Sequence, residues 1–311
     1  MRPLILILGP TAGSKTSLAI ELASVLPRGG ECVIADSMQI YRGMDIGTAK
    51  PTTEEQNLAP HHLIDIADPS EDGFTVDTWM QHSQIAIDEI RSREKWPIIV
   101  GGTNLYVQSL LFGMFDGPDK NPTRRAELQL ESNDTLHTLL KGLDSNAAKR
   151  IHINDTKRLV RAIEVCESTG QPISSLQSQW ENAIPREDAI LIGLTWPTQQ
   201  INRRINARVK KMMENGLLQE VENLQDSFGM QAKEALGYKQ LIAHLSGELS
   251  LEEAIEQIKI LTRRYAKQQR TWLRRFQVLP NTHFIDMENK TVQHAVNESV
   301  TFINGLGFST N

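Results

Sequence analysis

Cysteine is nearly absent from this chain of 311 residues. Cys32 and Cys166 are the only two, and they form neither a CxxC pair nor a cluster with histidines. This scarcity excludes a disulfide framework and argues against a zinc site. It is typical of a reducing compartment, so we expect a cytoplasmic protein.

A long apolar run is also missing. The first apolar stretch, 4–8, is too short to cross a bilayer, and it lacks the basic start, long apolar centre and small-residue cleavage site of a signal peptide. Its length is that of a buried strand. We therefore expect no membrane partner.

Positive net charge is lacking too, since the formal charge is −5, which at first argues against a nucleic-acid partner. The basic residues, however, are clustered. The segment 262–276 holds six Arg or Lys and no acid, 201–211 holds five and no acid, and 149–161 is a third cluster. Any one cluster is as readily a solvated helix face, but three in an acidic chain favour a polyanionic partner.

Short β-rich runs alternate with longer helical patterns in the first part of the chain. We expect strands at 4–9, 31–35, 97–100 and 189–195, and helices at 16–26 and 76–93. This alternation predicts a parallel α/β sheet. Residues 119–186 are rich in helix formers with Asn, Asp and Ser breaks, which predicts a small all-helical insertion. The core would then comprise 1–118 and 187–311.

The last third is largely helical. One helix begins near Thr198, and another begins at Ser250, where Ser250 and Glu253 form a capping box. The apolar side of this second helix carries Ile258, Leu261, Tyr265, Trp272 and Phe276. A basic stripe on another side carries Arg263, Lys267, Arg270 and Arg274. Trp272 could stack on a base, but its helical spacing favours burial.

A phosphate-binding loop lies between the first strand and the first helix. Residues 9–16 read GPTAGSKT, close to the P-loop pattern GxxxxGK[ST]. Backbone N–H groups and the helix N-terminus would hold phosphates, Lys15 would neutralise the outer one, and the Thr16 hydroxyl would reach Mg²⁺. The predicted diphosphate-binding residues are Gly9, Pro10, Thr11, Ala12, Gly13, Ser14, Lys15 and Thr16.

Ser14 breaks this pattern, because it stands where the P-loop has glycine. If the position requires a left-handed backbone, serine costs roughly 1–2 kcal/mol. Were that cost felt only in the bound state, phosphate binding would weaken about tenfold. The loop could instead adjust around Gly13, or be a relic that binds nothing.

Seven further motifs occur in order along the chain. They are DSMQIY (36–41), GTAKP (47–51), HHLID (61–65), GGTNLY (101–106), NDTKRLVRAIEV (154–165), ALGYK (235–239) and TRRYAKQQRTW (262–272). Together they resemble the bacterial-type tRNA dimethylallyltransferase family from Leu4 to about Phe276. The chain departs from the family in the order of Gly13 and Ser14, and in Gln268, where arginine is usual.

The resemblance implies an α/β fold with a P-loop NTPase-like parallel sheet core and a small helical insertion. It implies transfer of a dimethylallyl group from dimethylallyl diphosphate to N6 of the adenosine beside the tRNA anticodon, with Mg²⁺. Asp36, directly after a strand, takes the general-base role by resemblance; alone it would suggest helix capping or a Mg²⁺ contact. Thr103 resembles the family threonine that touches the target base.

Arginines would stabilise the leaving diphosphate. Arg204 has this role by resemblance, and Arg208, one helical turn further on, is a second candidate, although both could be solvated flanks of an apolar stripe. A stacked adenine is poorly accessible, so we expect it to be flipped out. The predicted tRNA contacts are Asp36, Ser37, Met38, Gln39, Thr103, Arg125, Arg158, Arg161, Arg263, Lys267 and Arg270. His61 and His62 lack a second ligand cluster, so we interpret them as structural.

Three other functions compete with tRNA prenylation. An adenylate isopentenyltransferase acting on AMP would have less need of the insertion and the basic stripe. A P-loop kinase would require ATP. A tRNA-binding protein with an impaired loop would bind tRNA and form no product. We expect a monomer, because no long heptad pattern or apolar patch is evident.

Overall fold

The computed structural model describes residues 2–114, 117–118, 121–177 and 184–308, and it divides the chain into two compact units. The first unit comprises Met1–Ser109 and Arg186–Asn311, and the second comprises Leu110–Pro185. The insertion was predicted over 119–186, of which residues 119–120 and 178–183 lie outside the described residues.

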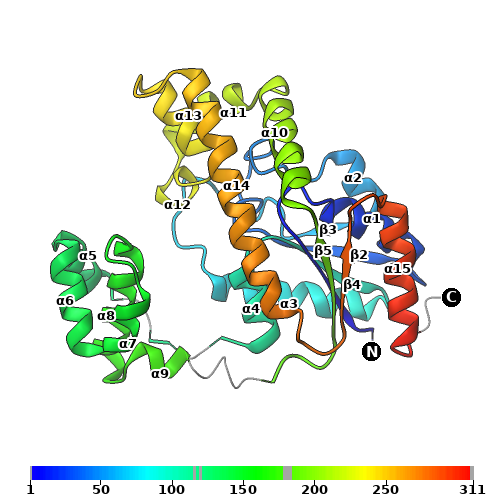
Figure 1. Cartoon of the computed structure of the whole chain (residues 1–311), viewed down its shortest axis with the longest axis horizontal. Helices are drawn as coiled ribbons and strands as arrows, with labels where there is room; N and C mark the ends of the chain where they lie inside the picture. The colour runs from blue at the N-terminus through cyan, green and yellow to red at the C-terminus, as the bar shows by residue number, and fades with distance from the viewer. Residues whose placement is uncertain (1, 115–116, 119–120, 178–183, 309–311) are drawn as a thin grey trace. The chain divides into compact units, whose positions relative to one another are not determined.

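A six-stranded parallel sheet forms the centre of the first unit, in the order β3-β2-β4-β1-β5-β6 (Figure 1). Its strands are β1 (Leu4–Leu8), β2 (Gly30–Ala35), β3 (His61–His62), β4 (Trp96–Gly101), β5 (Ala189–Thr195) and β6 (Thr282–Asp286). The predicted parallel α/β fold is therefore confirmed. The two edge strands, β3 and β6, were not predicted: β3 has two residues, and β6 (THFID) has only two adjacent apolar residues.

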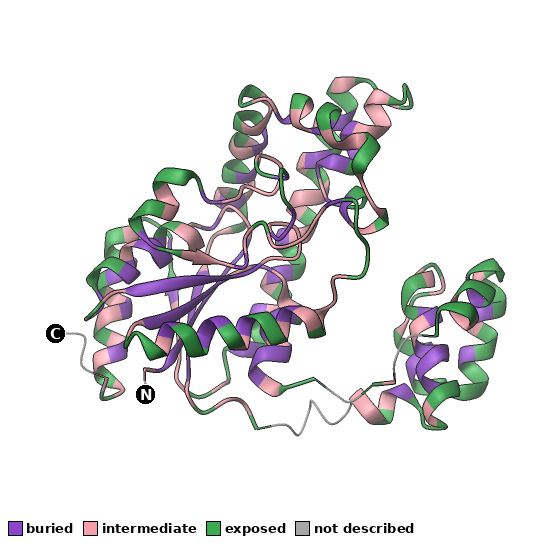
Figure 2. Ribbon diagram, turned by 180° about the vertical axis from the view of Figure 1, so that it is seen from behind, coloured by how far each residue is buried: buried purple, intermediate pink, exposed green. Residues whose placement is uncertain are grey.

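Helices cover the four central strands, which are almost entirely buried (Figure 2). Helices α1 (Lys15–Val25) and α15 (Val292–Gly305) pack with alternate residues of the central strands in one apolar cluster. Helix α3 (Val76–Ser92) contacts β2 and β4, and its Trp79 indole N–H donates to Ile34 O at 2.9 Å. Burial on both faces explains the continuous apolar strand sequences.

A helical layer follows β5 in the same unit. It consists of α10 (Thr198–Glu214), α11 (Leu217–Leu224), a 3₁₀ turn (Gln225–Ser227), α12 (Met230–Lys233), α13 (Tyr238–Leu245) and α14 (Leu251–Phe276); α2 (Thr53–Leu58) lies between β2 and β3. The predicted capping box of Ser250 and Glu253 is present. The predicted apolar side of α14 is partly wrong: Ala266, Gln269 and Leu273 are buried, whereas Trp272 is only half-buried, with Arg275 over its ring.

The second unit is helical throughout its described residues. The chain enters through α4 (Asn104–Phe112) and forms α5 (Pro122–Leu130), α6 (Asn133–Leu143), α7 (Ser145–Arg150), α8 (Thr156–Thr169) and α9 (Ile173–Gln177). These helices, from α5 onward, enclose an apolar cluster of their own, centred on Leu136, Leu140, Leu159 and Ile163. In the part of the chain that the structure describes, no helix is long and apolar enough to cross a membrane.

Candidate active site

Three turns meet where β1, β2 and β4 end, because the carboxyl ends of parallel strands lie at one edge of the sheet. The backbone N–H of Thr103 donates to Ala35 O at 3.0 Å, and the Ser37 N–H donates to the Thr103 hydroxyl at 2.9 Å. A Cβ at Gly101 would overlap Ala35 O, so only glycine allows this close approach. The turns after β2 and β4 thus form one unit around Asp36.

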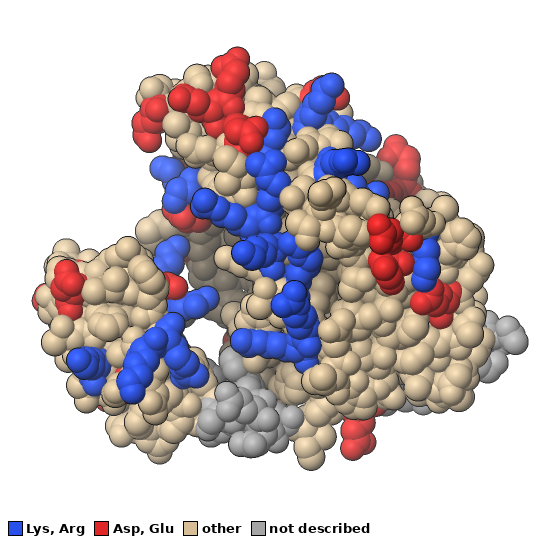
Figure 3. Space-filling view, viewed as in Figure 1, with Lys and Arg blue, Asp and Glu red and all other residues tan. Residues whose placement is uncertain are grey.

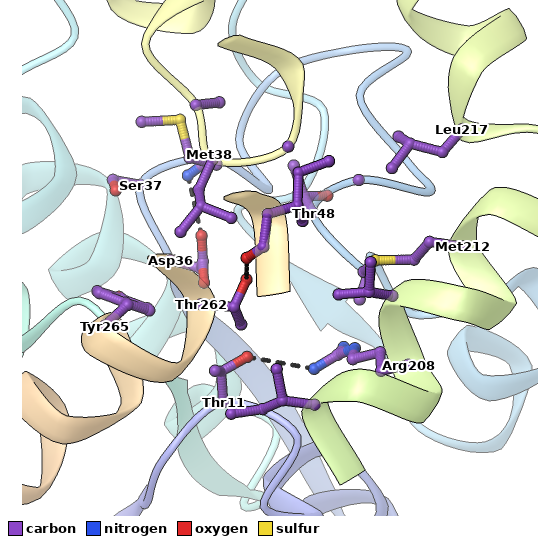
Figure 4. Close-up of a pocket in the computed structure, with 18 of the residues that line it drawn as sticks. Thr11, Asp36, Ser37, Met38, Thr48, Arg208, Met212, Leu217, Thr262 and Tyr265 are labelled. Atoms are coloured by element: carbon purple, nitrogen blue, oxygen red, sulfur yellow. Dashed lines mark hydrogen bonds between the residues drawn. The ribbon is translucent and has the colours of Figure 1, made fainter. Parts of the chain in front are cut away.

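Asp36 is fixed by its own turn and open toward a cavity. Its Oδ1 accepts the Met38 N–H at 2.9 Å, and its Oδ2 accepts no hydrogen bond from the described residues. The Thr103 hydroxyl donates to Ser37 Oγ at 3.3 Å. Figure 4 shows Asp36, Thr11 and Arg208 pointing into the same space. The arrangement leaves a carboxylate oxygen available to accept a proton from a bound molecule.

The phosphate loop connects β1 to α1 with Lys15 at the first helical position. The Lys15 ammonium donates to Pro10 O at 3.0 Å. The pKa of Lys15 is lowered to about 8, first by burial and then by the nearby charge of Arg208, while the charge of Asp36 opposes the shift. A lysine deprived of water beside another cation is a site that favours an anion.

Ser14 has a left-handed backbone (φ 67°), and so does Ala12 (φ 58°). The left-handed residue is therefore Ser14 itself, and the loop does not place Gly13 in that conformation instead. A Cβ at Gly13 would lie 2.7 Å from Pro10 O, which requires this residue to be glycine unless the loop moves. Because Ser14 is left-handed in the folded loop, its backbone cost falls on folding.

Arg204 and Arg208 project from α10 toward the phosphate loop. Arg204 donates from Nε to Ala12 O and from Nη2 to Ser14 Oγ, both at 2.7 Å, and its guanidinium lies 4.5 Å from the Trp196 ring centroid. Arg208 donates to Thr11 Oγ1 at 3.3 Å, and burial lowers its pKa. Both arginines thus border the loop, and neither forms an ion pair with an acidic side chain among the described residues.

Gln269 on α14 was not predicted as a site residue. It is 2% exposed, its Oε1 accepts the Thr11 N–H at 2.7 Å, and its Nε2 donates to Gly102 O at 3.1 Å. The Tyr265 hydroxyl donates to the same oxygen at 2.9 Å. A Cβ at Gly102 would overlap Gln269 Nε2. One buried amide therefore connects the phosphate loop to the turn that carries Thr103.

Two cavities adjoin Asp36. A polar cavity of about 630 Å³ is lined by the phosphate loop, Asp36, Gln39, Thr48, Arg204, Arg208 and Gln269 among others. A smaller cavity of about 250 Å³ is mainly apolar, with Met38, Ile205, Val209, Met212, Leu217, Leu236 and Ile258 among its lining residues (Figure 4). Thr11, Asp36 and Arg208 line both. The pair can accept a molecule with an anionic end and a short apolar end.

Glu220 on α11 organises the segment 45–49, whose Thr48 and Ala49 line both cavities, and it too was missed. Its carboxylate accepts the backbone N–H groups of Asp45, Ile46 and Gly47 at 2.8–3.1 Å, and the Tyr238 hydroxyl at 2.5 Å. A Cβ at Gly47 would overlap the Tyr238 ring. The GTAKP and ALGYK motifs therefore pack together, which the sequence shows only as two separate motifs.

The predicted tRNA contacts in the first unit lie in three places. Ser37 and Met38 line the apolar cavity, whereas Gln39 donates to Thr48 O at 3.0 Å and lines the polar one. On α14, Arg263 donates to Asn206 at 2.8 Å and Arg270 to Thr198 at 2.9 Å, and Lys267 is exposed. Figure 3 shows Lys and Arg side chains in a band over α10 and α14.

The predicted contacts in the second unit surround a buried carboxylate. Glu164 is 1% exposed and accepts from Arg125 at 2.7 Å and from Arg161 at 3.0 Å. Arg158 is 75% exposed and lies 3.3 Å from Asp155. Glu164 thus orients two arginines, and Arg158 is the more accessible cation.

Magnesium has few protein ligands to use at this site. Thr16 lines the polar cavity, and no group of three or more His, Cys, Asp or Glu side chains able to hold a metal occurs within the described ranges. Mg²⁺ commonly binds through one or two protein oxygens together with substrate phosphates. The residues present fit that mode. His61 and His62 lie in β3, where His62 Nε2 is 2.7 Å from Glu31 Oε2.

Known proteins match this chain over nearly its full length. The family model described as IPP transferase matches residues 39–276. A tRNA dimethylallyltransferase of Shouchella clausii is 48% identical over 280 residues, 88% of each chain, and one of Bacillus pumilus is 42% identical over 303 residues, 93% of this chain and 94% of the relative.

Solved structures agree with these matches. A tRNA delta(2)-isopentenylpyrophosphate transferase of Staphylococcus epidermidis aligns with a TM-score of 0.71 and 38% identity, covering 98% of this chain and 100% of the other. A eukaryotic dimethylallyltransferase acting on tRNA aligns with a TM-score of 0.81 and 28% identity, covering 98% and 80%.

Proposed function

The chain belongs to the IPP transferase family of tRNA dimethylallyltransferases, and from this premise we propose that it transfers a dimethylallyl group from dimethylallyl diphosphate to N6 of the adenosine beside the anticodon of a tRNA. Diphosphate is the second product. The observation that carries the proposal is the position of Asp36 at the junction of the polar and apolar cavities.

The two ends of the donor match the two cavities. The diphosphate would bind the N–H groups of the phosphate loop, with Lys15 and Arg208 as its cations, and the five-carbon group would enter the apolar cavity. Mg²⁺ held by the Thr16 hydroxyl and the phosphates would reduce charge repulsion as the diphosphate leaves. The carbon that bears the diphosphate would then lie near Asp36, which lines both cavities.

Asp36 would act as the general base. The N6 lone pair is delocalised into the adenine ring, so the amine attacks poorly until a proton leaves. As N6 bonds to the first prenyl carbon, the carbon–oxygen bond breaks, its electron pair goes to the diphosphate, and the N6 proton passes to Asp36. Thr103, which is hydrogen-bonded to Ser37, would hold the adenine so that its N6 faces Asp36.

The tRNA would contact both units. The band over α10 and α14 suits a phosphate backbone, and the arginines around Glu164 give the second unit a basic surface. A base extruded from the anticodon loop would meet Ser37 and Met38 at the apolar cavity. We further propose a cytoplasmic monomer, whose mass light scattering in solution would measure.

A transfer assay with two acceptors tests the proposal. Purified protein, Mg²⁺ and labelled dimethylallyl diphosphate are incubated without ATP, with unmodified tRNA in one tube and AMP in another. We expect label in tRNA, mapped to the adenosine beside the anticodon. Label in AMP alone would make the protein an adenylate isopentenyltransferase. No label in either, with tRNA binding retained, would show a tRNA-binding protein with an impaired loop.

A further inference from the structure

The departure at Ser14 places a hydroxyl where a P-loop glycine has no side chain. Ser14 Oγ accepts a hydrogen bond of 2.7 Å from Arg204 Nη2, an arginine of α10 that is distant in sequence. The contact is specific to the order Gly13–Ser14, because a glycine at position 14 offers Arg204 no partner. The exchanged residue therefore adds an interaction at the site where the leaving diphosphate is proposed to bind.

Two further contacts hold the same guanidinium. Arg204 Nε donates to Ala12 O at 2.7 Å, and the Trp196 ring lies 4.5 Å from the guanidinium carbon. The Trp196 indole N–H in turn donates to Gly13 O at 3.2 Å. Arg204 is thus hydrogen-bonded to Ala12 and Ser14 and stacked on the Trp196 ring. That ring is in turn hydrogen-bonded to Gly13, the loop residue between Ala12 and Ser14.

One nitrogen of the guanidinium remains for a ligand. Nη1 donates no hydrogen bond to any residue that the structure describes, whereas Nε and Nη2 are both used. Arg204 also lines the polar cavity together with the phosphate loop. Fixing a long, flexible arginine before the substrate arrives reduces the entropy lost when it binds an anion.

We propose that Ser14 is a positioning residue for leaving-group stabilisation: its hydroxyl, with the Ala12 carbonyl and the Trp196 ring, holds Arg204 so that Nη1 meets the departing diphosphate. This inference rests on the proposed diphosphate site. In this proposal Ser14 has a function in the loop: its hydroxyl fixes the Arg204 guanidinium, which a glycine at this position could not do.

A double-mutant cycle of Ser14→Ala and Arg204→Ala tests the inference. The dissociation constant of inorganic diphosphate with Mg²⁺ and kcat/KM for dimethylallyl diphosphate are measured for the wild type, both single variants and the double variant. Alanine keeps the Cβ and can adopt the left-handed backbone, as Ala12 does. Ser24→Ala, an exposed hydroxyl on α1, is the control, and melting curves verify that each variant folds.

With Arg204 present, we expect Ser14→Ala to weaken diphosphate binding and kcat/KM by roughly 2- to 10-fold, the range of one hydrogen bond. In the Arg204→Ala background, the same substitution should change either quantity by less than about twofold. An equal loss in both backgrounds would make Ser14 merely structural, and no loss in either would remove its role. Diphosphate binding without transfer by the wild type would overturn the proposed function while leaving this cycle readable.

Discussion

At the scale of single residues, Lys15 is a cation whose charge depends on its surroundings. Its ammonium is buried near Arg208, and burial together with the charge of Arg208 lowers its pKa to about 8. A bound diphosphate must raise this pKa, because the anion favours the charged lysine. The free and bound proteins then differ in protonation above about pH 8.

This difference predicts how binding depends on pH. Below about pH 8, Lys15 is charged in both states and adds no dependence. Between about pH 8 and the higher pKa of the complex, binding takes up a proton, so the affinity for dimethylallyl diphosphate falls as the pH rises, by up to about tenfold per unit. Titration calorimetry at pH 7 and 9 measures this, with Lys15→Arg as a variant that does not titrate. Identical pH profiles for the two proteins would contradict the prediction.

Ser14 also predicts an effect on folding. Both Ser14→Gly and Ser14→Ala remove the hydroxyl, but only glycine relieves the left-handed backbone. That relief is worth roughly 1–2 kcal/mol, and glycine gives back about 0.4–1 kcal/mol through the entropy of the unfolded chain. We therefore expect the glycine variant to have the higher free energy of unfolding in urea. Equal midpoints and slopes for the two variants would show that the loop relaxes around an alanine.

At the scale of elements, α14 connects the phosphate loop to the turn after β4 that carries Thr103. Gln269 joins the Thr11 N–H to Gly102 O, and therefore joins the loop after β1 to the turn after β4. The sequence gives no direct sign of this, because Gln269 is a polar residue within a basic stripe. Its burial follows from the contact of α14 with the sheet edge.

Replacing Gln269 tests this connection. Gln269→Leu leaves the Thr11 N–H without its partner and removes one of the two hydrogen bonds to Gly102 O, so we expect kcat/KM to fall by about 10- to 100-fold and the protein to lose about 1–3 kcal/mol of stability. Gln268→Leu, at an exposed neighbour, is the matched control. Steady-state kinetics and urea unfolding measure the two effects. Equal behaviour of the two variants would refute the role of the buried amide.

Local signals predicted the four central strands and four of the helices, and tertiary contacts decided much of the rest. The capping box at Ser250 and the continuous apolar strands identified α14 and the central sheet, because caps and burial on both faces leave direct sequence patterns. The burial of Trp272 was overestimated. Helical spacing identifies the apolar face of a helix, but it does not show how much of that face a neighbouring element covers. Gln269 and Glu220 could not be found because their partners lie far away in the sequence.

At the scale of the whole molecule, an acidic chain carries basic surfaces on both of its units. The net charge is −5, yet Lys and Arg gather over α10 and α14, and Arg158 is 75% exposed on the helical unit. Arg125 and Arg161 share a buried glutamate, so their removal would also disturb folding of that unit. Arg158 is therefore the cleaner probe of tRNA contact by the insertion.

We expect Arg158→Ala to weaken tRNA binding and to reduce the slope of log affinity against log salt by about 1, because one phosphate contact is lost. Filter binding between low and physiological salt measures the slope. Lys141→Ala, an exposed lysine on α6, is the control. If both variants keep the wild-type slope, Arg158 does not contact the backbone.

The measurement that tests the account most directly is single-turnover transfer by Asp36→Asn, with diphosphate and tRNA affinities measured on the same protein. Asparagine keeps the size of the side chain and an oxygen for the Met38 N–H, but it cannot take up a proton. The account predicts a loss in transfer rate of roughly 10²- to 10⁴-fold, with both affinities within about twofold of the wild type. A near-normal transfer rate would contradict it, because the N6 proton would then have another acceptor.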